Sequence, residues 1–210
     1  MKVSNRLAAM GMALMMPLAA SADEQAASRL TTLLEPLETY SAEFEQQILD
    51  SSGSRLQSAE GTMWLSRPGK FRWEVDEPYQ QVVVSDGEEV YLYDPDLAQV
   101  TVQPLDTRVT HTPALLLSGS ADALGKDYEV ERQQQGATET FTLVPKSPDT
   151  LFEQLKLVFH SEQLRGLRMS DSTGQQTTIS FQDPQHNQSI DPAKFEFKIP
   201  ENADVIRESR

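Results

Sequence analysis

Trp64-Leu-Ser-Arg-Pro-Gly-Lys-Phe-Arg-Trp-Glu74 is followed by Gln81-Val-Val-Val-Ser-Asp-Gly-Glu-Glu-Val-Tyr-Leu-Tyr-Asp-Pro-Asp96 and then by Gln99-Val-Thr-Val102. In this stretch Phe71, Trp73 and Val75 alternate with charged residues, which is the period of a strand with one buried face. Asp86-Gly87 lies between two apolar runs, and Asp-Gly is the preferred loop of a type I′ hairpin. The stretch therefore predicts a series of short antiparallel strands.

The segments on either side of this stretch contain the helices. Leu30, Leu33, Leu34 and Leu37 fall on one face of a helix within 24–40, which Pro36 ends or kinks. Two further short helices are expected between Leu105 and Lys126, because Pro113 stands at a helix start and glycines follow the apolar runs.

Strand patterns fill most of the remaining chain, separated by turns that contain glycine. The predicted strands are 42–49, 57–66, 71–75, 81–85, 89–93, 99–103, 128–132, 138–145, 152–159, 164–170, 177–182 and 195–199. So many sequential strands with short turns predict a mainly β fold with some helix, built on a strongly curved antiparallel sheet.

The N-terminus has the pattern of a secretory signal. Lys2 and Arg6 precede an apolar run and the small residues Ala20-Ser21-Ala22, so we expect cleavage of residues 1–22 and a single domain over 23–210. A retained membrane anchor is the alternative, although the run is short and Pro17 interrupts it. The chain has no cysteine, so it cannot carry the lipid of a lipoprotein.

Composition excludes some classes of partner. The formal net charge is −14, which argues against binding to nucleic acid or to anionic membrane surfaces. The negative charge also has a simpler explanation, which is that it keeps the protein soluble.

No residue pattern demands catalysis. His111, His160 and His186 lack the spacing of a metal site, so we expect neither a metal nor a cofactor. Asp94 and Asp96 could form a carboxylate pair for a hydrolase, but Asp and Pro are turn formers and a hairpin end explains them better.

What remains is apolar surface on the helices and on one face of the sheet. Such a sheet can close over an ordinary packed core, which composition alone favours, or it can keep a cavity for an apolar ligand.

Several strings of this sequence, in order, resemble the LolA family of periplasmic lipoprotein carriers. The resemblance spans essentially the whole chain. The segments that carry it are Tyr40-Ser-Ala-Glu-Phe-Glu-Gln46, Glu60-Gly-Thr-Met-Trp-Leu-Ser-Arg-Pro68, Lys70-Phe-Arg-Trp73, Ser85-Asp-Gly87, Tyr93-Asp-Pro95, Thr112-Pro-Ala-Leu-Leu-Leu117 and Asp191-Pro-Ala-Lys-Phe-Glu-Phe-Lys-Ile-Pro200. The last of these is similar to the closing strand of the family, and the segment before it to a lid helix.

The resemblance implies an incomplete barrel that encloses an apolar cavity under a lid of short helices. It implies that Arg67 hydrogen-bonds the lid backbone and holds the empty carrier shut. Phe71 and Trp73 would lie near the cavity mouth. The alternative is that they are inward core aromatics, and for Trp73 this alternative fits equally well. The apolar cavity residues would include Leu30, Leu34, Leu115, Leu116 and Leu117.

By the same resemblance, the protein is a soluble chaperone of the Gram-negative periplasm and not an enzyme. It would accept acylated lipoproteins from an inner-membrane ABC release complex and deliver them, as a monomer, to an outer-membrane acceptor. The alternative is a related lipid-binding or lipoprotein-sensing module on the same fold.

Overall fold

A single twelve-stranded sheet organises the part of the chain that the computed structural model describes, which is residues 19–105, 113–148, 150 and 152–208. His111 and Thr112, and most of the predicted signal, lie outside the described residues. The helices are α1 (Ala19–Leu34), η1 (a 3₁₀-helix, Pro113–Ser118), α2 (Ala121–Asp127) and η2 (a 3₁₀-helix, Pro192–Phe195).

The strands agree with the predicted ones to within a few residues, except for the last. They are β1 (Thr39–Leu49), β2 (Arg55–Ser66), β3 (Lys70–Glu77), β4 (Gln81–Asp86), β5 (Glu89–Asp94), β6 (Gln99–Pro104), β7 (Tyr128–Gln135), β8 (Thr138–Pro145), β9 (Gln154–His160), β10 (Gln163–Ser170), β11 (Gln176–His186) and β12 (Asp204–Arg207).

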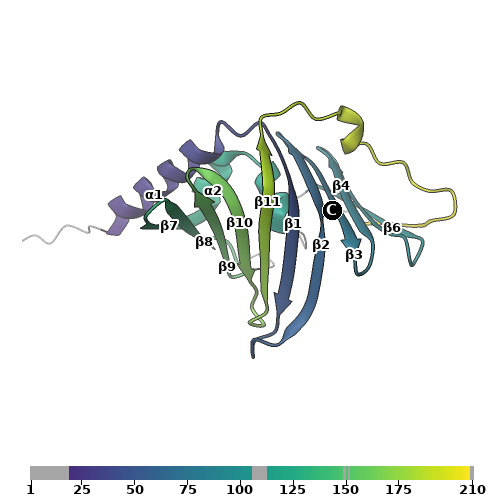
Figure 1. The fold of residues 1–210 in the computed structure, drawn as a ribbon, viewed down its shortest axis with the longest axis horizontal. Coiled ribbons are helices and arrows are strands. Elements are labelled where there is room, and N and C mark those ends of the chain that lie inside the picture. Colours follow the sequence, from purple (N-terminus) through teal and green to yellow (C-terminus); the bar gives the residue numbers. More distant parts are fainter. Residues whose placement is uncertain (1–18, 106–112, 149, 151, 209–210) are drawn as a thin grey trace, which may run out of the picture.

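The sheet is strongly curved and stays open. Its strand order is β12-β6-β5-β4-β3-β2-β1-β11-β10-β9-β8-β7, and the neighbours pair antiparallel except for β12 on β6. Within the described residues the two end strands, β7 and β12, do not pair with each other. The predicted incomplete antiparallel barrel is therefore confirmed as the fold class (Figure 1).

Residues at alternate positions divide the sheet into a concave and a convex face. On β3, Phe71 and Trp73 lie on the concave face, opposite Leu65 and Met63 of β2. Helix α1 packs against the β7 end of the sheet, and η1 and α2 lie behind the strands in the view of Figure 1. The main core therefore lies between these helices and the concave face.

Helix α1 ends where the sequence predicts. Glu35 donates its backbone N–H to the Thr31 carbonyl, after which Pro36 cannot continue the ladder. At its other end α1 begins at Ala19, before the predicted cleavage point.

The C-terminal segment covers part of the convex face, and here one prediction was wrong. Residues 195–199 do not form a strand. Asp191 caps η2 by accepting from the Ala193 N–H, which turns the chain at Pro192, and only β12 then pairs with β6. The alternation of Phe195 and Phe197 reflects a segment that lies across the sheet: Phe195 is buried, and Phe197 contacts the rings of Tyr91 and Tyr93.

The β4–β5 hairpin forms as predicted, but its turn is not type I′. That turn needs positive φ at both central residues, whereas in the loop between β4 and β5 only Gly87 has positive φ (105°). The reason is the Asp86 side chain, whose Oδ1 accepts from the N–H groups of Glu88 and Glu89 at 2.8 and 2.9 Å. Asp86 thereby acts as the cap of the turn, and Gly87-Glu88 forms the loop.

Candidate functional site

Arg67 joins two separate helices to the end of β2. Its Nη1 donates to the carbonyl of Leu34, the last residue of α1, at 2.7 Å, and its Nε donates to the carbonyl of Leu117 in η1 at 2.9 Å. These contacts span 33 and 50 positions of sequence. We call this arrangement, Arg67 with the carbonyls of Leu34 and Leu117, the Arg67 junction.

The guanidinium of Arg67 and the two helix carbonyls are chemically suited to each other. The last carbonyls of a helix lack intrahelical partners and carry partial negative charge, so a cation stabilises them. A guanidinium presents its donors in a rigid fork, which lets one side chain serve two carbonyls. The adjacent turn adds a backbone contact, because the Gly69 N–H donates to the Ser118 carbonyl at 2.9 Å.

Burial makes the Arg67 charge less stable than it is in water. The pKa of Arg67 is lowered to about 10 because the group is desolvated, so it keeps its charge at neutral pH. Its Nη2 is buried and has no hydrogen-bond partner among the described residues. This N–H group of the guanidinium could thus donate a hydrogen bond to a new acceptor if the helices move.

Beneath the junction lies a continuous apolar interior. The seven apolar residues that the sequence predicts for the cavity or its mouth are all at most 3% exposed and belong to one cluster: Leu30, Leu34, Phe71, Trp73, Leu115, Leu116 and Leu117. Phe71 and Trp73 point inward, which agrees with the interpretation of both as inner-face aromatics. The interior is packed by these side chains, and an enclosed cavity stays a prediction.

An aromatic layer around Phe44, which was not predicted from the sequence, completes this interior. Phe44 of β1 stacks on Trp73 with ring centroids 3.5 Å apart, and Phe71 lies 6.2 Å from Trp73. The alternation of Tyr40, Ala42 and Phe44 along β1 is the signal that could have found it, because it places Phe44 on the concave face.

A charged cluster at the other side of α1 was also missed. Glu139 on β8 is 5% exposed and accepts from Arg29 of α1 at 3.1 and 2.7 Å and from Arg132 of β7 at 2.7 Å. The alternation along β8 could have indicated that Glu139 is buried, because Glu139 shares its face of the strand with buried Phe141 and Leu143. The hydrogen bonds from Arg29 hold the pKa of Glu139 below its usual value.

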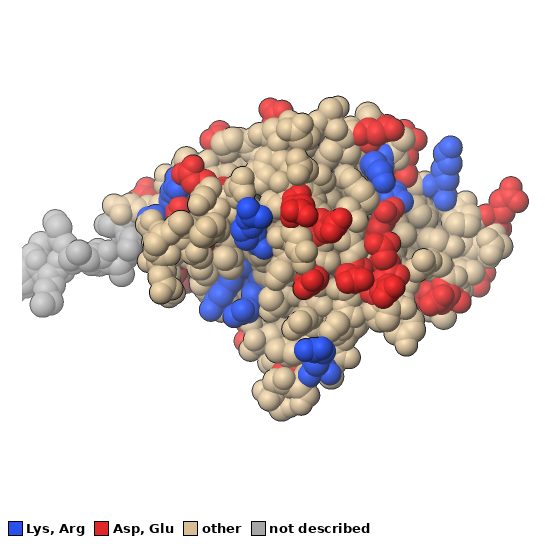
Figure 2. Space-filling model, in the orientation of Figure 1, with Lys and Arg blue, Asp and Glu red and all other residues tan. Residues whose placement is uncertain are grey.

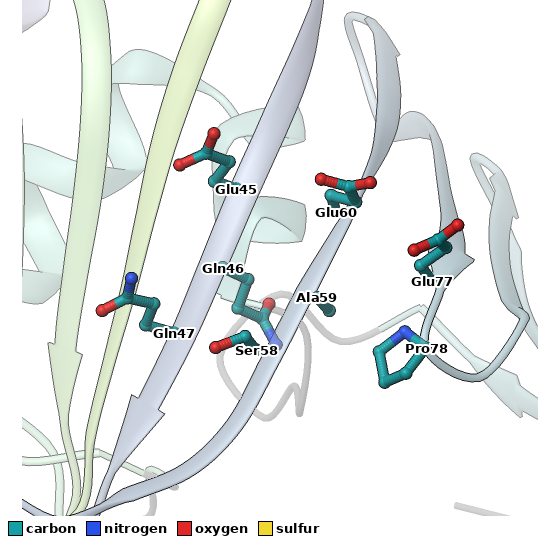
Figure 3. A pocket seen from close by; sticks show the side chains of 8 residues that line it. All are labelled: Glu45, Gln46, Gln47, Ser58, Ala59, Glu60, Glu77 and Pro78. Carbon is teal, nitrogen blue, oxygen red and sulfur yellow. The ribbon is translucent and has the colours of Figure 1, made fainter.

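Acidic side chains gather on the convex face over β1–β3 (Figure 2). Glu45, Glu60 and Glu77 line an open pocket of about 310 Å³ where β3 ends beside β2 (Figure 3). This pocket lies at the opposite end of β2 from Arg67. Among the described residues no group of His, Cys, Asp or Glu is arranged to hold a metal ion.

Three of the other candidate polar residues, Asp94, His160 and His186, have structural partners. Asp94 accepts from the Leu97 N–H in the β5–β6 turn at 3.1 Å, as expected of a turn former. His160 pairs with Thr138, and His186 packs against the ring of Tyr40. In the described residues, no helix combines the length and apolar character needed to cross a membrane.

The fold is an open half-barrel whose apolar interior is covered by helices, with an arginine that bonds the cover to the rim, and these features define a class of helix-covered, incomplete β-barrels. Within that class, residues 35–198 match the family model described as outer membrane lipoprotein carrier protein LolA. The chain belongs to this family.

Curated relatives match over nearly the full chain. One from Chromohalobacter salexigens is 66% identical over 200 residues, which covers 95% of each chain, and one from Azotobacter vinelandii is 49% identical over 90% of this chain and 91% of the relative. Both are named outer-membrane lipoprotein carrier protein.

Solved structures share the fold at low sequence identity. A LolA superfamily protein from Nitrosomonas europaea aligns with a TM-score of 0.53 at 8% identity, over 84% of this chain and 98% of its own. An uncharacterized conserved protein from Thermus thermophilus aligns with a TM-score of 0.53 at 14% identity, over 88% and 98%. These likenesses bear on the fold alone.

Proposed function

We propose that this protein is a periplasmic carrier of acylated lipoproteins, whose acyl chains bind between the concave face and the helices that cover it. In this proposal residues 1–22 are a cleaved signal and residues 23–210 form the carrier domain. An inner-membrane ABC complex supplies the cargo, and an outer-membrane acceptor receives it. The protein itself performs no covalent chemistry.

The observation that carries the proposal is the Arg67 junction above the leucine and aromatic interior. A core that served only stability would not need a half-buried arginine to bridge two helix ends at its border. Hydrogen bonds to two carbonyls, by contrast, can break and re-form without loss of the fold. The family membership and the names of the relatives support the same function.

The energetics of acyl chains suit such a carrier. Burying one methylene is worth ~0.8 kcal/mol, so a chain of about sixteen carbons represents roughly 12 kcal/mol. A lipoprotein with several such chains cannot cross water unaided at a useful rate. A carrier only needs to cover the chains, and this requires no cofactor.

Delivery requires that the affinity of the carrier for its cargo is limited. The empty interior is already filled by the leucines of α1 and η1 and by Phe44, Phe71 and Trp73. Cargo binding therefore has to separate these contacts and the Arg67 junction, and that cost is subtracted from the affinity. The closed state thus favours release to an acceptor.

Incubation with spheroplasts tests the proposal. Protein purified from the periplasm is added to spheroplasts that are synthesising radiolabelled lipoproteins. We expect labelled lipoproteins in the medium as one-to-one complexes with the carrier. Lipoproteins that stay in the membrane at saturating carrier would contradict the proposal, and so would release that is equally large with an unrelated acidic protein of the same size.

A further inference from the structure

One edge of β2 has no neighbouring strand near the point where β2 begins. Residues 60–66 of β2 pair with β3, whereas residues 57–59 pair only with β1 within the part of the chain that the structure describes. The pairing with β3 stops at Glu77, because Pro78 has no N–H with which to continue the ladder. We call residues 57–59 the free edge of β2. Two of them, Ser58 and Ala59, line the pocket of Figure 3.

Three glutamates stand in one row across the strands at this edge (Figure 3). Glu45 of β1 pairs with Glu60 of β2, and Glu60 pairs with Glu77 of β3. Like charges directly opposite each other on neighbouring strands are destabilising. Glu45 accepts a hydrogen bond from Gln182 at 2.7 Å, but no ion pair among the described residues joins any of the three to a cation. A cation from another molecule would relieve the repulsion within this glutamate row.

Two exposed apolar side chains flank the free edge. Leu56 immediately precedes it on β2 and is 59% exposed, and Tyr79 directly follows Pro78 and is 71% exposed. Tyrosine is common in protein interfaces because its ring supplies contact area while its hydroxyl stays hydrated. Unpaired backbone groups, carboxylates and apolar side chains are therefore available together at this end of β2.

Charge decides which molecule fits this place. An unpaired strand edge is a template for another extended chain. A second copy of this chain that paired edge to edge would set the glutamate row against itself, and an anionic membrane surface or a nucleic acid would be repelled in the same way. No group of His, Cys, Asp or Glu among the described residues is arranged to hold a metal ion. An extended peptide with lysine or arginine satisfies both the backbone and the carboxylates.

From these features we infer that the free edge of β2 is a docking site for a protein partner, which adds a short, basic, extended segment as a strand beside residues 57–59. The segment lies where β3 would have continued past Glu77. Its lysine or arginine side chains face the glutamate row. The site is at the opposite end of β2 from Arg67, so a docked partner leaves the helical cover unobstructed. The inference goes beyond the carrier function and does not depend on it.

A titration followed by NMR tests the docking site with a defined probe. The probe is the peptide Lys-Val-Lys-Val-Lys, blocked at both ends, added to ¹⁵N-labelled protein. The same peptide with glutamate in place of lysine controls for charge. Two further versions are methylated on the backbone nitrogens, one at the valines and one at the lysines. They keep the charge, but each loses the N–H groups along one side of the strand, because successive N–H groups of a strand point to opposite sides.

We expect the lysine peptide to shift the amide resonances of residues 57–59 and to give NOEs to the backbone of β2. Only one of the two methylated peptides should lose binding, by at least about tenfold, because only one side of the added strand bonds to β2. The other methylated peptide should bind as the unmodified one does. The glutamate peptide should not bind.

Protein variants test the glutamate row. Glu60→Gln/Glu77→Gln should bind the lysine peptide about fivefold more weakly than wild type. Glu88→Gln/Glu131→Gln removes two exposed carboxylates elsewhere and should bind as wild type does. Urea unfolding should show that Glu60→Gln/Glu77→Gln is at least as stable as wild type, because the repulsion is relieved. A less stable variant would contradict the repulsion on which the inference rests.

Several results would overturn the inference. They are no shift at residues 57–59 with millimolar peptide, equal binding of both methylated peptides, and equal binding by wild type and Glu60→Gln/Glu77→Gln. Shifts confined to the concave interior would mean that the peptide binds as cargo. Shifts of residues 57–59 that depend on protein concentration without peptide would assign the edge to a second copy. A failed spheroplast release would leave the docking site in place and would remove only the carrier function.

Discussion

Phe44 on β1 and Trp73 on β3 stack face to face across β2, with an interplanar angle of 18°. The residue of β2 that pairs with Phe44 is Gly61, which also pairs with Val75 of β3. A Cβ at Gly61 would overlap the carbonyl oxygen of Glu74 and lie 2.9 Å from Cζ of Phe44. The glycine is therefore what allows the two rings to meet over the middle strand.

Substitution of this glycine should loosen the interior. We expect Gly61→Ala to lower the free energy of unfolding by about 1–3 kcal/mol, because the backbone carbonyl must move and the ring stack must separate. Gly125→Ala is the matched control: its Cβ would meet only ordinary contacts in α2, and we expect a gain of about 0.5–1 kcal/mol. Urea unfolding followed by tryptophan fluorescence measures both. Equal stability of the two variants would contradict the account of Gly61.

Loss of the Arg67 side chain should weaken the closed state. In Arg67→Leu the carbonyls of Leu34 and Leu117 lose their shared donor, so less of the cargo's binding energy is spent on opening. We predict that the variant retains lipoproteins and passes them to acceptor membranes more slowly than wild type. The control is Arg55→Leu, the same change at an exposed position on β2, which should transfer cargo normally. Transfer by Arg67→Leu at the wild-type rate would show that the junction does not hold the carrier shut.

Stability should fall in acid through Glu139. Its pKa lies below the ordinary value of 4.5 in the folded protein because Arg29 and Arg132 stabilise the carboxylate. A lowered folded pKa adds stability that is complete above the unfolded pKa and is lost as the pH falls through the folded one. At pH 7 we expect the free energy of unfolding of wild type to exceed that of Glu139→Gln by about 2 kcal/mol.

This difference should shrink toward zero as the pH drops below 4.5, as measured by urea unfolding at pH steps. Glu131 is exposed, so the free energy of unfolding of Glu131→Gln should stay close to that of wild type at every pH. A Glu139→Gln difference that is constant with pH would mean that the charge of the carboxylate does not contribute.

The C-terminal segment should contribute to the stability of the fold through buried contacts of its own on the convex face. Phe195 is buried with Val84, Val100 and Val102 on the convex face, and none of these residues belongs to the cluster under the helices. We expect Phe195→Ala to cost about 3–5 kcal/mol of unfolding free energy. Phe197→Ala removes a half-buried ring and should cost markedly less. Denaturant unfolding compares them, and equal costs would show that Phe195 does not anchor the segment.

The sequence predicts the strands well because their signal is local. Phe71, Trp73 and Val75 alternate on β3, and Gly87, Gly136 and Gly174 stand in hairpin loops with positive φ. Periodicity and turn chemistry need no knowledge of distant residues. The same holds for the end of α1, which Pro36 determines.

What escaped prediction depends on contacts between distant parts of the chain. Arg29 and Glu139 are 110 positions apart, and nothing near either residue indicates the other. The segment around Phe195 has the alternation of a strand, but the edge of β6 pairs with β12 instead, and the segment around Phe195 lies across the convex face. The role of Arg67 came from family resemblance, and its two carbonyl partners became visible only in the folded chain.

Photo-cross-linking of an acyl chain tests the central claim most directly. A lipoprotein whose fatty acids carry a diazirine near the methyl end is loaded onto the carrier, irradiated and digested for mass spectrometry. We predict adducts on the concave face, at residues such as Phe44, Met63 and Leu116. Adducts confined to the convex face, or none on the carrier despite stable binding, would contradict the claim that this interior shelters acyl chains.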